Sequence, residues 1–223
     1  MALSITLVIL IITCIISISA FNQQKIIDDL IFYPPAVTRR KQYYRFITHG
    51  LIHADFMHLA FNMLALYLFG EGLEKVMSIE CVFGKMGKVF FLILYLTALI
   101  VASLPDYFRY KDSYHFRSLG ASGAVSAVIF SMIVFFPQSP IGLMFIPVRI
   151  PGWIFGILYL GVTVYLDKRG RDNINHSAHF FGAAYGVVFT LVCSALFADS
   201  FDVYENFLTQ IRSSAEDLTL LCQ

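Results

Sequence analysis

Apolar residues gather into six stretches along the chain, separated by polar or proline-containing segments. The stretches cover residues 2–21, 57–72, 89–104, 121–137, 151–166 and 177–198. A helix needs about 20 predominantly apolar residues to cross the hydrocarbon core of a bilayer, and several of these stretches are slightly shorter. Short spans bring helix ends close to the membrane interior. The pattern predicts an all-α polytopic membrane protein with six transmembrane helices.

The segments between the stretches differ in character. Residues 22–56 are long for a connector and rich in aromatic residues, so we expect them to fold onto or into the membrane surface. Residues 137–151 contain four prolines and predict a turn-rich connector. We therefore expect a core over residues 1–198, with a first loop at about 22–56. Residues 199–223 form a mixed tail in which an amphipathic helix is possible, and we assign it no function.

The first stretch has two interpretations. Residues 3–18 are apolar and small residues follow them, as in a signal peptide. No Lys or Arg precedes the apolar run, however, so the usual basic start is missing. We therefore favour a retained first span.

Composition supports a membrane location. The 223 residues are 58% hydrophobic and only 14% charged, and six spans of about 20 residues would leave roughly 100 residues for loops and ends. This arithmetic leaves no room for a large soluble domain. The 16 basic and 15 acidic residues give a net charge of +1, and no basic run is dense enough to bind phosphates. We expect the lipid bilayer as partner and no nucleic acid.

Polar residues within such stretches are costly unless they are satisfied, so each is a functional candidate. The second stretch begins with His58 and Asn62, whose i, i+4 spacing puts the imidazole and the amide on one helix face. The alternative is a pair of interfacial residues that stabilise helix packing.

The fourth stretch begins with a serine between residues that lack bulk. Gly120, Ala121, Ser122 and Gly123 put a hydroxyl in the first turn of a helix, where free backbone amides favour a developing negative charge. The alternative is small-residue helix packing.

The sixth stretch begins with two histidines, and the second of them is followed by small residues. On a helix, His179, Gly182 and Gly186 share a face, so a neighbouring backbone can approach the imidazole closely. The alternative, a histidine at the water interface, fits His176 better than His179.

The three clusters begin the second, fourth and sixth stretches, which all start on the same side of a six-span protein. They can therefore meet in one cavity. A serine, a histidine and extra donors are the minimum set for acyl transfer by a hydroxyl nucleophile. Ser122 would attack the carbonyl and His179 would take its proton, while the Ser122 amide, His58 and Asn62 hold the oxyanion. No acid lies within a helical turn of His179, so we expect a dyad.

The motif order HxxxN, GxSG and AHxxGxxxG across six spans resembles the rhomboid intramembrane serine proteases, over essentially the whole chain. The resemblance implies a six-helix rhomboid-like bundle. It also implies that Ser122 and His179 form the catalytic dyad and that His58 and Asn62 stabilise the oxyanion.

Several further residues match supporting positions of that family. His53 corresponds to a histidine that braces the first loop, Arg45 follows Tyr44 where the family has a Trp-Arg pair, and Glu74 corresponds to a glutamate after the second span. We also expect structural support from the glycines at the span starts, which are Gly120, Gly123, Gly182 and Gly186.

One position departs from the family pattern. Many members carry a tyrosine four residues after the catalytic serine, stacked on the catalytic histidine, whereas this chain has Ser126. A compensating aromatic ring could come from the fifth stretch, where Phe155 and Tyr159 are available.

The resemblance implies a serine endopeptidase that cleaves transmembrane protein substrates in or near their membrane segments, with no cofactor and no metal. It also implies an integral multi-pass protein of the bacterial inner membrane, with the active site towards the outer face. Most basic residues lie on the active-site side, which by the positive-inside rule favours the opposite orientation. A catalytically silent rhomboid-like protein that binds membrane clients, and a small transporter, are the alternative functions.

Overall fold

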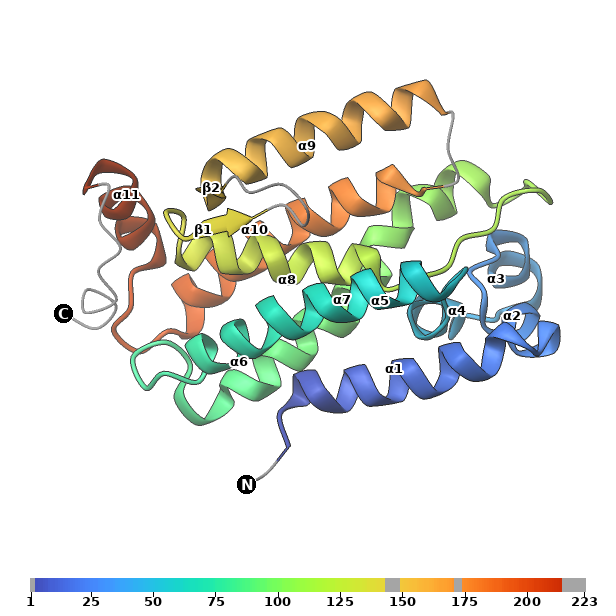
Figure 1. Cartoon of the computed structure of the whole chain (residues 1–223), viewed down its shortest axis with the longest axis horizontal. Helices are drawn as coiled ribbons and strands as arrows, with labels where there is room; N and C mark the ends of the chain where they lie inside the picture. The colour runs from blue at the N-terminus through green and yellow to red at the C-terminus, as the bar shows by residue number, and fades with distance from the viewer. Residues whose placement is uncertain (1–2, 143–148, 171–173, 214–223) are drawn as a thin grey trace.

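The computed structural model describes residues 3–142, 149–170 and 174–213, and within these ranges the chain is mostly helical (Figure 1). Three continuous helices are long and apolar enough to cross a bilayer: Phe56–Met77, Gly84–Tyr110 and His176–Phe197. Two apolar helices are shorter, Ile5–Phe21 and Ser122–Phe135. The all-α prediction holds for most of the described chain.

The helices that coincide with the six apolar stretches form the bundle. They are α1 (Ile5–Phe21), α5 (Phe56–Ala65) continued by η2 (Leu66–Gly70) and α6 (Glu71–Met77), η3 (Gly84–Met86) with α7 (Gly87–Tyr110), α8 (Ser122–Phe135), α9 (Gly152–Arg169) and α10 (His176–Phe197). The remaining elements are shorter and lie between or after them. They are α2 (Gln24–Leu30), α3 (Pro34–Arg40), α4 (Arg45–Thr48), η1 (His49–Leu51), β1 (Pro140–Gly142), β2 (Arg149–Pro151) and α11 (Val203–Ser213).

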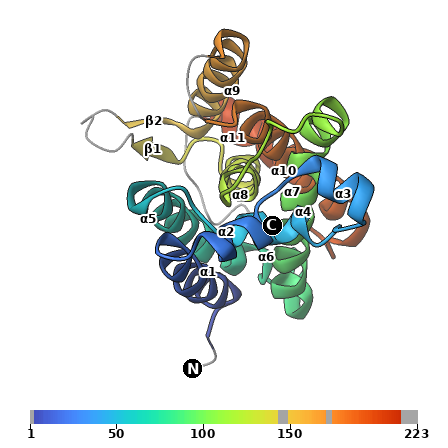
Figure 2. The same cartoon turned by 90° about the vertical axis from the view of Figure 1, so that its right-hand side faces the viewer.

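The bundle helices lie side by side, and α5, α8 and α10 all start at the end of the bundle that carries α2, α3 and α4 (Figure 1). Viewed from that end, α8 lies in the middle, with α1 and α9 at the periphery (Figure 2). The residues of α8 are small or apolar and are almost all buried. The helix that begins with Ser122 therefore packs against protein along nearly its whole length.

The structure corrects the predicted boundaries in four places. The second span extends to Met77, with the buried Glu74 bonded to the first amides of α1, and the third extends to Tyr110, whereas α8 ends early, at Phe135. The connector at 137–151 contains an antiparallel hairpin of β1 and β2, which the all-α prediction missed. The tail forms α11, but residues 143–148 of the connector, 214–223 of the tail and residue 2 lie outside the described residues.

Large apolar side chains remain exposed on the outer faces of the bundle. They include Ile11, Ile12, Ile15, Phe61, Leu68, Ile157, Leu158, Val162 and Leu196. Soluble monomers rarely expose contiguous apolar surface of this kind, which in a helical bundle indicates contact with lipid. With the three long apolar helices, this surface identifies an integral membrane protein.

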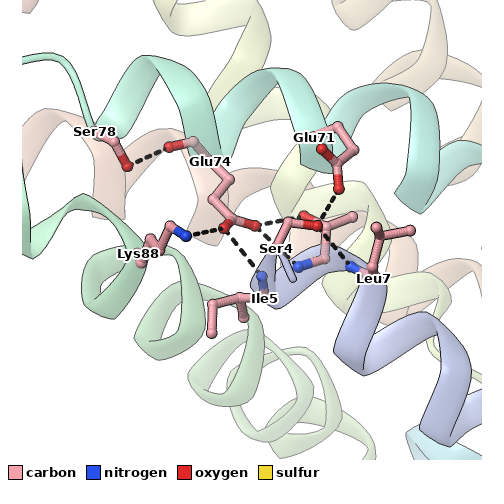
Figure 3. A network of polar contacts seen from close by, with 8 residues as sticks. Ser4, Ile5, Leu7, Glu71, Glu74, Ser78 and Lys88 are labelled. Carbon is pink, nitrogen blue, oxygen red and sulfur yellow. Dashed lines mark hydrogen bonds and ion pairs between the residues drawn. The ribbon is translucent and has the colours of Figure 1, made fainter. Parts of the chain in front are cut away.

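The start of α1 is fixed by the carboxylate of Glu74 (Figure 3). Its oxygens accept hydrogen bonds from the backbone amides of Ile5 (3.0 Å) and Thr6 (2.9 Å) and from the Thr6 hydroxyl (3.0 Å). Lys88 lies 3.9 Å away, and the Glu74 side chain is buried. Because the first amides of a helix have no partners within it, a buried carboxylate there satisfies α1 and joins it to α6 and α7.

Glu74→Ala is expected to lower the free energy of unfolding by about 2–4 kcal/mol, because it leaves buried amides of α1 without acceptors. Glu74→Gln keeps an acceptor and should lose less. Thermal unfolding in detergent measures both. Glu71→Ala is the matched control, since Glu71 accepts only from the Ser4 hydroxyl among the described contacts. An equal loss in the Glu71 variant would contradict the special role of Glu74.

Candidate active site

A cavity of about 1080 Å³ lies where α5, α8 and α10 begin. Its walls include all four residues that the sequence assigned to the chemistry, which are Ser122, His179, His58 and Asn62. Further polar groups complete the walls: Asp106 from α7, Tyr159 from α9, Ser126 from α8, and Asn175 and His176 from the start of α10. The structure thus brings the three predicted clusters into one space large enough for a side chain and water.

The turn before the nucleophile is held by two histidines. Gly120 has a φ of 110°, which favours glycine, and a Cβ at this position would lie 2.7 Å from Cε1 of His58. The Gly120 amide donates to the carbonyl of His49 (2.9 Å), and the Ala121 amide donates to Nε2 of His53 (3.3 Å). Ser122 is the first residue of α8, so its amide belongs to the turn without helical partners. It is the amide available to an oxyanion.

His58 and Asn62 lie one turn apart on α5, beside this amide. The Ala54 amide donates to Nδ1 of His58 at 3.5 Å, a long bond that favours a hydrogen on Nε2. The Asn62 amide nitrogen donates one hydrogen to the His58 carbonyl (2.9 Å), which leaves its second hydrogen for the cavity. Both side chains can therefore act as donors to a negatively charged oxygen.

His53 connects α1 to the turn before Ser122. The Ser17 hydroxyl donates to the Leu51 carbonyl (2.9 Å), so it accepts from Nδ1 of His53 (2.9 Å), and Nε2 is left to accept from Ala121. These bonds require a neutral ring. Burial, followed by the neighbouring His58 and His49, lowers the pKa of His53 to about 3, and burial lowers the pKa of His49 to about 4. The contacts of His53 extend beyond the first loop, because its ring also accepts a hydrogen bond from the turn before Ser122.

These two buried imidazoles predict a loss of stability in acid. Unfolded histidine titrates near pH 6.5, so between about pH 6.5 and pH 3 the unfolded chain binds protons that the folded chain does not. The contribution of the two neutral rings to the free energy of unfolding is therefore complete above about pH 6.5. Below that pH it decreases, by up to about 1.4 kcal/mol per pH unit for each histidine. Thermal unfolding from pH 7 to pH 4.5 measures this slope.

Within the same pH series, His53→Gln should flatten the slope, because one of the two buried imidazoles is gone. His115→Gln, which removes an exposed histidine, is the control and should leave it unchanged. Equal slopes in wild type and His53→Gln would contradict the expectation.

Helices α8 and α10 cross in backbone contact beside the two reactive residues. A Cβ on Gly182 would lie 2.1 Å from the carbonyl oxygen of Gly123, and one on Gly186 would lie 2.2 Å from that of Ala127. A Cβ on Gly123 would lie 2.7 Å from the Cβ of Ala102 on α7. The glycines at these positions permit the close approach that the sequence predicted between the serine helix and the histidine helix.

An aromatic ring from α9 lies against the imidazole of His179. The ring centres of Tyr159 and His179 are 6.4 Å apart and their planes are within 18° of parallel. The Tyr159 hydroxyl is hydrogen-bonded to the hydroxyl of Ser126 (2.7 Å). Of the two aromatic residues that the sequence left open, Tyr159 is the one beside His179, and Phe155 packs against it (centroids 5.8 Å apart).

Arg45 fastens the first loop at the rim of the site. Its guanidinium donates to the carbonyls of Asp28 (2.9 Å) and Ile31 (2.7 Å) and to the Gln42 side chain (2.7 Å), and it lies over the Tyr44 ring. The Arg45 side chain therefore joins the end of α2 to α4.

Sequence reasoning missed a polar group on α7. Asp106 is 2% exposed, lines the cavity and accepts from the side chain of Asn175, the residue before α10 (2.6 Å). An acid two residues beyond the predicted end of an apolar stretch was the available signal. Over the described ranges, no group of three His, Cys, Asp or Glu side chains is placed to hold a metal ion.

Comparison with known proteins identifies the family. The model of the Rhomboid domain family matches residues 40–196, which is more than half of the chain. The chain therefore belongs to the rhomboid family. Family membership supports a function of the intramembrane-protease type.

Three relatives illustrate the range of the family. RHOMBOID-like protein 12, mitochondrial, of Arabidopsis thaliana is 30% identical over 149 residues, which are 64% of this chain and 44% of that protein. Putative rhomboid protease YdcA of Bacillus subtilis is 28% identical over 154 residues, 68% of each chain. Rhomboid protease GlpG of Haemophilus influenzae is 22% identical over 186 residues, 78% of this chain and 84% of that protein. The chain spans less than half the length of the plant relative.

Proposed function

We propose that this protein is a serine endopeptidase that hydrolyses peptide bonds in or near the transmembrane segments of other membrane proteins. The observation that carries the proposal is the single cavity in which a serine at a helix start, a histidine, and two further donors meet. A packing role for each cluster separately would not require their convergence. Two of the relatives are named as proteases.

The proposed reaction proceeds by acyl transfer. Oγ of Ser122 attacks the scissile carbonyl carbon while His179 takes the hydroxyl proton, and the oxyanion is held by the Ser122 amide with His58 and Asn62. The C–N bond then breaks, and His179 returns the proton to the leaving amine. Water attacks the acyl ester with His179 again as base, which releases the acid and restores the serine.

We further propose six membrane spans. Besides the three long helices, α1, α8 and α9 would each cross the membrane. An α8 of 14 residues is only about 21 Å long, but it lies in the middle of the bundle, so it need not match the thickness of the lipid. Helix α9 has 18 residues and ends with Asp167, Lys168 and Arg169, charges suited to a membrane surface.

We propose the bacterial cell membrane as its location. The matches cover 68% and 84% of the two bacterial relatives but only 44% of the plant mitochondrial protein, which supports a bacterial type of core.

The purified full chain in detergent tests the function. It should cleave a single-span membrane protein and react with a fluorophosphonate at Ser122, and Ser122→Ala and His179→Ala should abolish both. A folded wild-type protein that neither cleaves nor reacts would instead be a silent rhomboid-like protein that binds membrane clients. Reporter fusions after residues 80 and 170 would determine the orientation.

The ring of Tyr159 is expected to orient His179. Tyr159→Ala should lower kcat by about tenfold or more, since small displacements of a catalytic group are costly, while Tyr159→Phe keeps the ring and loses only the bond to Ser126. Adding Ser126→Tyr to Tyr159→Ala should recover part of kcat, because it returns a ring to the same space from α8. Wild-type kcat in Tyr159→Ala would contradict this role.

A further inference from the structure

We propose that Asp106 is a positioning residue of the active site, which through Asn175 and Ser177 fixes the first turn of α10 and thereby the direction of the His179 imidazole. The inference rests on the proposed function. Nothing in the predicted dyad requires an acid from α7, so the residue is an addition to that chemistry.

The burial of Asp106 calls for an explanation. Its side chain is 2% exposed, and it follows Pro105 within α7, near the end of the helix that faces the cavity. A carboxylate is withdrawn from water at a considerable cost unless donors surround it. The donors here come from the segment that begins α10 and not from α7 itself.

Two side chains of that segment bond to Asp106. Asn175 donates from Nδ2 to Oδ2 of Asp106 (2.6 Å), and the Ser177 side chain is also hydrogen-bonded to the carboxylate. Asn175 and Ser177 lie on either side of His176, so the carboxylate holds the backbone at both ends of a three-residue segment.

Asn175 transmits this constraint to the helix. Its Oδ1 accepts from the Ala178 amide (3.0 Å), which makes it the N-cap of α10. Its Nδ2 is shared between Asp106 and the Ser118 hydroxyl (3.0 Å), and its carbonyl accepts from the His179 amide (3.3 Å). Because both ends of the Asn175 amide are engaged, the cap has one orientation, and the turn that carries His179 is fixed relative to α7.

The position of this turn matters for the proposed reaction. The glycine contacts hold α10 against α8 at Gly182 and Gly186, after His179, and a Cβ on Gly123 would lie 3.3 Å from the carbonyl oxygen of Ala178. Asp106 fixes the helix on the other side of the imidazole. His179 is thus held between two fixed points, and loss of one would let the ring swing away from Ser122.

The test distinguishes loss of the hydrogen bond between Asp106 and Asn175, which we call the bridge, from loss of the N-cap of α10 and from unfolding. Asn175→Ser keeps a capping oxygen but cannot reach Asp106 with an amide, and Asp106→Ala removes the acceptor. Both are expected to lower kcat about 10- to 100-fold with little change in KM, and to slow fluorophosphonate labelling of Ser122 in protein that is still folded. Asp106→Asn retains a carbonyl acceptor for Asn175 and should recover most of kcat. Asp199→Ala, which removes an exposed acid outside the cavity wall, is the matched control.

The outcomes distinguish this inference from the proposed function. If wild type is active and both bridge variants keep its kcat, or lose activity only in proportion to the folded fraction measured by thermal unfolding, the positioning role of Asp106 is wrong. The same holds if Asp199→Ala lowers kcat as much as Asp106→Ala. If wild type itself neither cleaves nor labels, it is the proposed function that fails.

Discussion

Ser122→Ala is expected to lower turnover of a transmembrane substrate by at least about 10³-fold, because it removes the hydroxyl that forms the acyl ester in the proposed mechanism. The same change should alter the free energy of unfolding by less than about 1 kcal/mol. The residue is the first of α8, where small neighbours pack, and alanine favours a helix at least as well as serine. Turnover and thermal unfolding, measured on one preparation, check both statements.

Ser131, a second serine of α8, is the control and is expected to give the opposite result. Ser131 is fully buried, its hydroxyl donates to the Gly186 carbonyl (3.1 Å), and it does not line the cavity. Ser131→Ala should lose about 1 kcal/mol of stability and retain turnover. If Ser122→Ala unfolds the protein, or if it remains active, Ser122 has a structural role and the proposed mechanism is wrong.

The sequence predicts the bundle and the meeting of the three clusters because both depend on periodicity. Polar residues at i and i+4 share a helix face, and helices that alternate in direction return their starts to one side. The same reasoning failed for α6, whose Glu71, Glu74 and Lys75 interrupt the apolar pattern. The burial of Glu74 becomes favourable because α1 supplies amide partners for it, and that contact joins residues nearly 70 positions apart.

The surroundings of His179 show a second limit of sequence reasoning. Ser126 indicated that a ring was missing from α8, but only the packing of α9 selects Tyr159 over Phe155. Asp106 was not predicted at all, since its relation to α10 passes through Asn175. Groups that act on His179 from other helices leave no spacing pattern in the chain.

Gly182→Leu is expected to damage stability and turnover together. The Cβ alone would lie 2.1 Å from the carbonyl oxygen of Gly123 and 2.9 Å from its Cα, in backbone that cannot rotate away. Overpacking typically costs about 1–3 kcal/mol, and here α10 must move away from α8 as a whole. Thermal unfolding in detergent measures the first loss. Gly161→Leu is the matched control on α9, where a Cβ meets nothing within 4 Å, and it should leave both properties unchanged.

The loss of turnover in Gly182→Leu should be larger than the unfolded fraction explains, because the contact between α8 and α10 lies next to Ser122 and His179. Gly123 directly follows Ser122, and Gly182 is three residues from His179, so the separation of the helices at this point sets the distance between nucleophile and base. A displacement of about 1 Å can cost a reaction about 10²-fold. Gly182→Ala, which introduces only the Cβ, allows the measurement in protein that remains folded at low temperature. Wild-type kcat in folded Gly182→Ala would show that the helix crossing does not position the dyad.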